Sequence, residues 1–330
     1  MSFKRLDPED FLVSIDSVTA TAWSTNNPTL STFFTSSTTS SNDSYYKNVY
    51  QTSSTVTSTA VQFAIAYGNK VGSGSVNYND LVPGATPTRT IYGQYRNLVY
   101  GDENAQFIFG TVTASDFWAI NIDRARYKEH LLKGTFNLTL TGSGIGSLKL
   151  TDNSGMVSTD TYLDCGRVYQ IISGSNGVAF SGTGFSASSG SYGLFLPDIS
   201  TIILNPLALS QSINLTPSRS NDSDGENIGR LFTAISGAAS FQLNSEETTT
   251  SDYVFVRARN AEFNYSENPS FISGSTGDVI YSNFINSPQT YMTTVGFYND
   301  TNELLAVAKL SKPLLKDFTK EALVRVKLDF

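Results

Sequence analysis

The sequence predicts an all-β protein with minor helix, and three observations support this fold class. Ser and Thr make up about a quarter of the 330 residues, and Tyr (17) and Phe (21) are abundant. Thr is β-branched and Tyr and Phe are aromatic, and both kinds of side chain favour strands, whereas Ser favours turns. Short apolar runs, several alternating with period two, recur along the chain. Gly, Ser and Asn gather between these runs, as is typical of tight turns.

The first 133 residues are expected to supply strands and one helix to a core domain. Apolar residues at helical spacing after a Pro-rich turn predict a short amphipathic helix over residues 90–100. Residues 124–132 indicate a short helix or a charged extended segment. The strands expected here are residues 11–15, 61–67, 105–112 and 117–122.

Residues 24–59 are dominated by Ser, Thr and Asn, with aromatic residues such as Phe33 and Tyr50 at intervals. Low complexity with few charges is typical of a flexible arm. The aromatic side chains favour a different interpretation, in which the segment becomes ordered when it packs on something, such as another subunit. We prefer this second interpretation.

The character of the sequence changes at Gly134. From there to about residue 215, short β-like runs alternate with Gly/Ser turns at the spacing of a sandwich or small barrel. Residues 218–227 form a polar exit loop, and longer strands return after it, two of them joined by an Asn/Asp turn. The expected strands are residues 136–141, 147–151, 168–172, 177–180 and 199–204, followed by 253–259, 290–297, 304–310 and 322–330.

Together these patterns predict a β-sandwich core domain with an inserted smaller β-sandwich-like domain. The core domain is expected to be discontinuous, formed by residues 1–133 plus 245–330, and to carry the Ser/Thr-rich arm at 24–59. The inserted β domain is expected at residues 134–244.

The charge of the chain limits its partners. A net charge of −7 argues against nucleic acid, because phosphate binding needs a basic face. The sequence contains no run of 18 apolar residues, so it predicts no membrane-spanning helix. Residues 1–10 lack the apolar middle of a secretory signal, and Cys165 has no second cysteine to pair with, so we expect folding in a reducing cytoplasm. With only 15% charged residues, the surface suits protein–protein contact.

A single His and a single Cys restrict the catalytic possibilities. His130 would have to serve any Ser–His–Asp or Cys–His site, and a multi-His metal site is excluded. We interpret His130 as a partly exposed residue at the end of an element. Arg167 is close enough in sequence to lower the pKa of Cys165, but a buried structural cysteine is the preferred interpretation. The Gly-rich residues 142–146 lack the Lys of a phosphate loop and predict a turn.

Two charged segments each allow two interpretations. Residues 222–226 begin like a calcium loop, but its twelfth position is Thr233, so a solvated acidic loop is preferred. The second segment contains Arg124, Arg126 and Lys128 at alternate positions. On a strand they would share one face and could clamp carboxylates of a neighbouring chain. The preferred interpretation is a solvated basic stripe. We therefore expect no catalytic residue, no cofactor and no metal ligand.

Four stretches of the sequence are similar to those of a known group of proteins. They are DFWAINIDRARYKEHL (116–131), LDCGRVYQIISGSNG (163–177), FNYSENPSF (263–271) and YMTTVGFYNDTNELLAVAKLSKPLLK (291–316), with residues 62–100 fitting the same picture. They resemble virion structural proteins of contractile-tailed bacteriophages, in particular β-rich baseplate wedge subunits. The resemblance covers about half of the chain, includes no chemically diagnostic motif and carries over no catalytic residues. It implies a non-enzymatic building block of a symmetric tail or baseplate, in contact with other virion subunits and with copies of itself.

Three functions follow from the sequence as hypotheses. The preferred one is a structural subunit of a phage virion, made in the host cytoplasm and most naturally placed in the tail baseplate wedge. The first alternative is a carbohydrate-binding or adhesion fibre, or a structural protein of the head or neck. The second alternative is a hydrolase of cell-wall polysaccharide, which needs only two suitably placed carboxylates.

Overall fold

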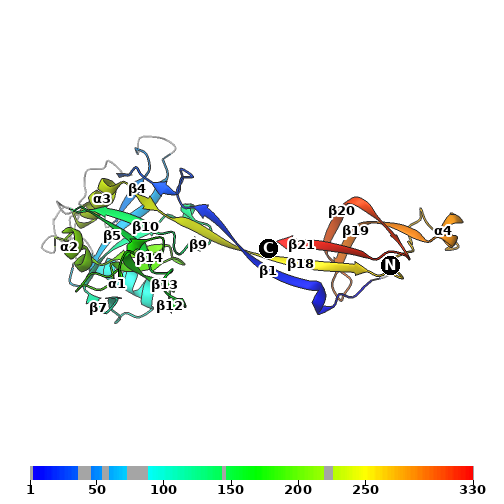
Figure 1. Ribbon diagram of the computed structural model, residues 1–330, viewed down its shortest axis with the longest axis horizontal. Helices are drawn as coiled ribbons and strands as arrows, with labels where there is room; N and C mark the ends of the chain where they lie inside the picture. Colours follow the sequence, from blue (N-terminus) through cyan, green and yellow to red (C-terminus); the bar gives the residue numbers. More distant parts are fainter. Residues whose placement is uncertain are drawn as a thin grey trace. The chain divides into compact units, whose positions relative to one another are not determined.

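The computed structural model describes residues 3–35, 46–53, 59–72, 88–142, 146–218 and 226–329, in two compact units (Figure 1). We call Val18–Glu247 the large unit, and Met1–Ser17 with Thr248–Phe330 the small unit. The chain passes between them twice, within strands β1 (Phe11–Thr21) and β18 (Asn244–Ala258). Strands predominate among the described elements, which confirms the predicted all-β class with minor helix.

One sheet carries most of the large unit. Its strands lie in the order β2-β17-β10-β11-β13-β15-β16-β8-β5-β4-β3, and β12 and β14 also pair with β13. Their bounds are β2 Thr29–Leu30, β3 Phe34–Thr35, β4 Tyr46–Tyr50, β5 Val61–Asn69, β8 Asp116–Ile122, β10 Asn137–Thr141, β11 Ser147–Asp152, β12 Thr161–Leu163, β13 Gly166–Ser175, β14 Val178–Ala179, β15 Gly193–Leu196, β16 Thr201–Leu204 and β17 Phe241–Gln242.

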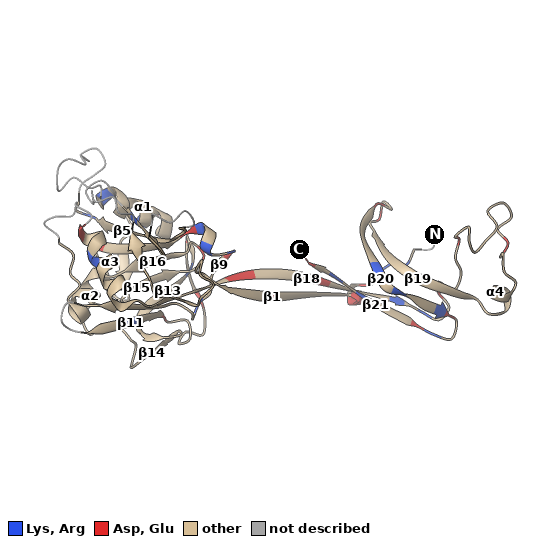
Figure 2. Ribbon diagram, turned by 90° about the horizontal axis from the view of Figure 1, so that it is seen from above, with Lys and Arg blue, Asp and Glu red and all other residues tan. Residues whose placement is uncertain are grey.

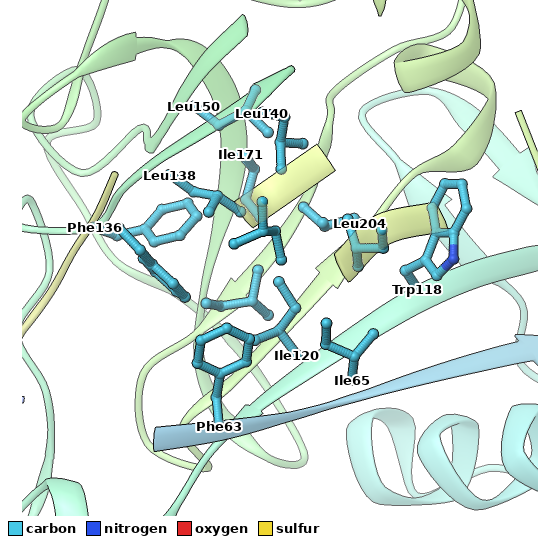
Figure 3. Packing of buried hydrophobic residues seen from close by; sticks show 14 of the residues in the cluster. Phe63, Ile65, Trp118, Ile120, Phe136, Leu138, Leu140, Leu150, Ile171 and Leu204 are labelled. Carbon is cyan, nitrogen blue, oxygen red and sulfur yellow. The ribbon is translucent and has the colours of Figure 1, made fainter. Parts of the chain in front are cut away.

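Both faces of this sheet are apolar in its central strands. In β8, Trp118 and Ile120 belong to one buried cluster, the inner core, while Phe117 and Ala119 belong to a second, the outer core. The division follows from the strand geometry, because successive side chains point to opposite faces. Figure 3 shows inner-core side chains from several strands directed toward one another.

The sheet curls until strands far apart in its order meet across the inner core. Phe63 of β5 and Phe241 of β17 are seven strand steps apart, which is about 34 Å in a flat sheet with a spacing of about 4.8 Å. Their ring centroids are 5.4 Å apart. Strands from the two halves of the sheet therefore close on each other around a single apolar interior.

The segment after β1 bridges this closure. Trp23 packs against both of the phenylalanine rings. On one side the Ala22 N–H donates to the Leu243 carbonyl, and on the other the Ser24 N–H donates to Gln62 Oε1, both at 3.1 Å. Residues 22–24 thus satisfy one polar group next to β17 and one on β5, and so connect the two halves of the sheet.

Helices cover both faces of the curled sheet. Two of them contribute buried residues to the inner core, and a third helix and a short hairpin cover the outer core. Trp118 Nε1 in the sheet donates to the Asn227 carbonyl at 2.8 Å, which ties the sheet to an inner helix. The inner helices are α2 (Pro206–Ile213) and α3 (Glu226–Ala238), and the outer elements are α1 (Thr88–Tyr100), β6 (Phe107–Phe109) and β7 (Val112–Ala114).

Helix α2 is begun and ended by residues that favour helix ends. Asn205 Oδ1 accepts the Leu207 N–H at 3.1 Å, and Pro206 occupies the first helical position, where its missing N–H costs nothing. The helix ends at Asn214, whose φ of 55° is left-handed, a conformation that Asn tolerates.

The small unit is built from a sheet in the order β1-β18-β21 and a separate two-stranded sheet, β19-β20. Strands β18 and β21 pair antiparallel from Ser251↔Asp329 to Ala258↔Ala322. Within the large unit, β9 (His130–Leu131) pairs with the first residues of β18. The remaining elements of the small unit are η1 (Pro8–Asp10), β19 (Gln289–Tyr298), β20 (Leu304–Asp317), β21 (Ala322–Asp329) and the short helix α4 (Asn283–Asn286).

The division into units differs from the expected one. We expected residues 134–244 to be inserted into a core formed by 1–133 plus 245–330, but the inserted unit begins at Val18 and ends at Glu247. The physical reason is strand pairing across the expected boundary. Strand β16 pairs with β8, with Ile202 opposite Ile120, so residues before and after position 134 share one sheet and one core.

The local elements agree with the sequence prediction in part. The predicted helix at 90–100 is confirmed as α1. The expected strand at 105–112 is broken, because Gly110, with φ of 65°, turns the chain between β6 and β7. Helices α2 and α3 were not expected.

The Ser/Thr-rich arm at 24–59 is described in part. Strands β2, β3 and β4 lie within it and belong to the main sheet. Leu30 and Val49 are buried in the inner core. The described part of this segment therefore packs on its own large unit, while residues 36–45 and 54–58 lie outside the described residues.

Candidate functional site

Charged side chains gather in the large unit where β9, β13 and the turn after β15 come together. Leu131 N–H of β9 donates to the Pro197 carbonyl at 3.1 Å, which fixes this junction. The group includes His130 and Arg167, both of which the sequence singled out. These residues form the candidate site of the large unit, and they are joined by ion pairs.

His130 lies between two carboxylates. Its Nε2 is 3.0 Å from Glu246 Oε2, and its Nδ1 is 3.8 Å from Glu129 Oε2. His130 and Glu246 are also register partners on β9 and β18. A general base in a triad turns one ring nitrogen toward a nucleophile, whereas here both nitrogens face acceptors. The arrangement suits a cross-strand clamp.

Arg167 is committed to Asp198. Its Nη2 and Nε lie 2.5 Å and 3.0 Å from Asp198 Oδ1, and its backbone N–H donates to Oδ2 at 2.7 Å. Burial opposes ionisation of Asp198, but the hydrogen bonds from Arg167 outweigh it and hold the pKa of that carboxyl below its usual range. The preceding Gly166 has φ of 106°, and a Cβ there would lie 2.4 Å from Asp198 Oδ2, so the close approach requires glycine.

Lys133 makes a second ion pair nearby. Its Nζ lies 2.8 Å and 2.9 Å from the two carboxylate oxygens of Asp160 and 5.5 Å from the centroid of the Tyr169 ring. The hydrogen bonds to Asp160 raise the pKa of the Lys133 ammonium. The described charged groups at this junction thus hold one another, in an arrangement that fastens strands and turns.

Cys165 is half-buried beside this junction. Burial raises the pKa of its thiol to about 11, and the carboxylates of Asp198 and Asp164 add to the effect. Arg167 does not activate it, because Arg167 is paired with Asp198. The structure thus agrees with the interpretation of Cys165 as a structural cysteine rather than a nucleophile.

We therefore expect Cys165 to react slowly with disulfide reagents. At pH 8 a thiol with a pKa of about 11 is about 0.1% thiolate, against about a quarter for an ordinary cysteine thiol. Reaction with a chromogenic aromatic disulfide should be on the order of a hundredfold slower in the folded chain than in urea. Equal rates in the two states would contradict the assignment.

The basic segment at 124–128 does not form a strand. Arg124–Arg126 is the short 3₁₀ helix η3, begun by Asp123, whose Oδ1 accepts the Ala125 N–H. The Arg124 guanidinium lies over the Tyr127 ring at 4.8 Å, and Lys128 makes an exposed ion pair of 3.7 Å with Glu247. The shared strand face that a clamp on a neighbouring chain would have needed is absent here.

Two further expectations lie largely outside the described residues. These are the acidic segment at 222–226, of which only Glu226 is described, and the Gly-rich turn at 142–146, of which residues 143–145 are not. Glu226 accepts a hydrogen bond from Arg230 Nε at 3.1 Å. Among the described residues, no group of three His, Cys, Asp or Glu side chains is placed to hold a metal ion, and no helix has the length and apolarity to cross a bilayer.

The small unit presents a different kind of candidate site. Its buried apolar side chains, among the described residues, are four: Val254, Ala258, Ala322 and Val326. Its exposed large apolar and aromatic side chains are Phe3, Phe11, Leu12, Val13, Ile15, Tyr265, Ile280, Tyr281, Ile285, Tyr291, Tyr298, Leu304, Leu305, Val307, Leu314, Phe318 and Leu323. A monomeric unit rarely leaves so much apolar surface uncovered, and such surface marks a site of protein–protein contact.

Strand β1 is the clearest part of this surface. It is an end strand of its sheet, and Leu12 and Val13, which point to opposite faces, are 55% and 61% exposed. Ile15 is 71% exposed. The sequence predicts a strand here but not its exposure. The available signal was the consecutive apolar run Phe11-Leu12-Val13, which is apolar on both faces although neither face is buried.

Comparison of this chain with protein-family models, with curated proteins and with solved structures finds no match.

Proposed function

We propose that this chain is a non-enzymatic structural subunit of a bacteriophage virion, with the tail baseplate as its most natural place. The observation that carries the structural role is the composition of the small unit, in which four buried apolar side chains stand against seventeen exposed ones. A unit of this kind gains its apolar core by contact with other chains. The resemblance to baseplate wedge proteins supports the virion assignment.

The large unit supports the same role in a different way. Its curled sheet has a full inner core and a covered outer face, and its charged junction at His130, Arg167 and Lys133 consists of paired groups. These features suit a rigid body that holds a position in an assembly. The partners we propose are other baseplate and tail subunits and copies of this chain.

The test is to locate the chain in intact particles. Antibodies raised against the large unit and gold-labelled should decorate the tail end of phage particles that carry this chain. Chemical cross-linking of the same particles should join the chain to other virion proteins. Particles that contain no such chain, although infected cells do, would refute the virion role.

A carbohydrate-binding fibre is the second candidate, because the exposed surface of the small unit includes Tyr265, Tyr281 and Tyr291. Aromatic rings of this kind stack on sugar rings. A glycan array probed with the full chain tests this candidate directly. Binding that is lost when these tyrosines are replaced by Ala would favour it over the structural role.

A further inference from the structure

We propose that the small unit assembles with further copies of this chain, the β1 edge of one copy adding to the β21 edge of the next. The inference rests on the proposed structural role and names one of its partners. It follows from three properties of the small unit: two free sheet edges, apolar side chains beside one of them, and opposite charge on the two.

The sheet β1-β18-β21 ends in two edges. Within the described residues, β1 and β21 each pair with β18 and with no other strand. An unpaired edge presents a row of N–H and C=O groups that another strand can pair with. Natural edges are usually short or blocked by charge, proline or a bulge. Strand β1 spans eleven residues, Phe11–Thr21, contains no proline, and has Asp16 as its one charged residue.

The apolar side chains of β1 are exposed on both faces of the strand. Phe11, Val13 and Ile15 lie on one face and Leu12 on the other, each at least half exposed. Adding a strand to this edge would extend both faces of the sheet and cover side chains on each. On the opposite edge, Leu323 of β21 is 58% exposed and offers an apolar contact of the same kind.

The whole exposed set is large enough for a stable interface. Seventeen side chains, about half exposed, offer on the order of 1,000 Å² of apolar area if each presents on the order of 150 Å² when fully exposed. A stable interface buries about 800 Å² per partner, and obligate ones bury more and resemble a core cut in half. The small unit has the composition of such a half core.

Charge decides between the ways in which copies can meet. Residues 6–17 carry four carboxylates, Asp7, Glu9, Asp10 and Asp16, and no Lys or Arg. Figure 2 shows blue positions along β20 and β21. Residues 304–329 contain three carboxylates, Asp317, Glu321 and Asp329, but also five exposed basic residues. The basic residues are Lys309, Lys312, Lys320, Arg325 and Lys327.

Two β1 edges placed antiparallel about Val13 would bring Asp10 of one copy opposite Asp16 of the other, and like charges directly opposite destabilise a strand pair. Two β21 edges placed antiparallel about Val326 would bring Arg325 of one copy opposite Lys327 of the other. Pairing of β1 with β21 avoids both conflicts. This contact is heterologous, and copies that repeat it form a ring when the rotation between neighbours closes.

The first experiment measures the mass of the full chain in solution by sedimentation velocity at several concentrations. The wild-type chain should sediment as one oligomer. Ile15→Lys should shift it toward the monomer, because it places a charge in the middle of the β1 edge. Val71→Lys is the matched control, since Val71 is 73% exposed in the large unit and Ile15 is 71% exposed in the small unit.

The second experiment identifies the paired edges. In a Cys165→Ser background, one chain carries Val13→Cys on β1 and another carries Leu323→Cys on β21. A short bismaleimide should join the two chains when they are mixed and reassembled, but join neither with itself. Cross-linking of the Val13→Cys chain with itself would overturn the β1–β21 pairing in favour of β1–β1.

A monomeric wild-type chain at every concentration, or an Ile15→Lys chain with the same mass as wild type, would overturn the proposal. The proposed virion role fails separately. A chain that is monomeric alone but is found in particles, cross-linked to other virion proteins, keeps its structural role and loses self-assembly through β1. The exposed edge would then belong to a different virion protein.

Discussion

Replacing Phe63 by Ala is expected to lower the free energy of unfolding of the large unit by about 3–5 kcal/mol. The Phe63 ring is fully buried and lies 5.4 Å from the Phe241 ring and 6.3 Å from the Trp23 ring. These contacts join strands from the two halves of the curled sheet. The substitution therefore removes buried apolar area and leaves a cavity in the inner core where these strands face each other.

Urea unfolding followed by tryptophan fluorescence measures this effect cleanly. The two tryptophans of the chain, Trp23 and Trp118, both lie in the inner core, so the signal reports on the large unit. The control is Phe180→Ala, a phenylalanine that is 64% exposed, which should leave the transition nearly unchanged. Equal loss of stability in the two variants would mean that the closure across Phe63 is not a principal source of stability.

The sequence was sufficient for the fold class because alternation is a local property. Val61–Asn69 and Asp116–Ile122 are apolar runs whose side chains divide between two cores, and each could be recognised as a strand by itself. Which strand pairs with which is a property of distant segments. The pairing of β16 with β8 joins residues about eighty positions apart, and this pairing moved the unit boundary from 134 to Val18.

The two inner helices could have been found. Ile228, Leu231 and Ile235 recur at helical spacing in Glu226–Ala238, and all three are buried in the inner core. Pro206 directly after Asn205 is a usual start of a helix. The Gly- and Ser-rich segments around these helices favour turns and obscure the change of apolar period from two to 3.6.

The interaction surface could not be read from the sequence in the same way. Strand β21 alternates between buried Ala322 and Val326 and exposed Leu323 and Arg325. An apolar residue on the outer face is compatible with burial against the same chain, burial against another chain or exposure. Only the structure distinguishes these, because it shows which faces the chain itself covers.

The second large effect is expected at the ion pair between Arg167 and Asp198. Arg167→Ala should lower the stability of the large unit by about 2 kcal/mol at pH 7, between the cost of breaking a buried pair and that of an exposed one. The side chains of Arg167 and Asp198 are 17% and 31% exposed. The substitution leaves a partly buried carboxylate without the guanidinium that offsets its burial.

The effect should depend on pH with a definite sign. The folded-state pKa of Asp198 lies below its usual range, so the ion pair contributes fully above the unfolded pKa of about 4. This contribution is lost as the pH falls through the folded value. The difference in stability between wild type and Arg167→Ala should therefore be constant from pH 7 to about pH 5 and shrink below about pH 4.

Lys128→Ala is the matched control for this pair. It also removes an ion pair of the large unit, but an exposed one, in which Lys128 Nζ lies 3.7 Å from Glu247 Oε2. Exposed pairs contribute little, so this variant should unfold like the wild type at every pH. A difference for Arg167→Ala that stayed the same at pH 3 as at pH 7 would locate its origin in the packing of the Arg167 stem. In that case the junction of β13 with the turn after β15 would be held by apolar contact, and the carboxylate of Asp198 would be incidental to it.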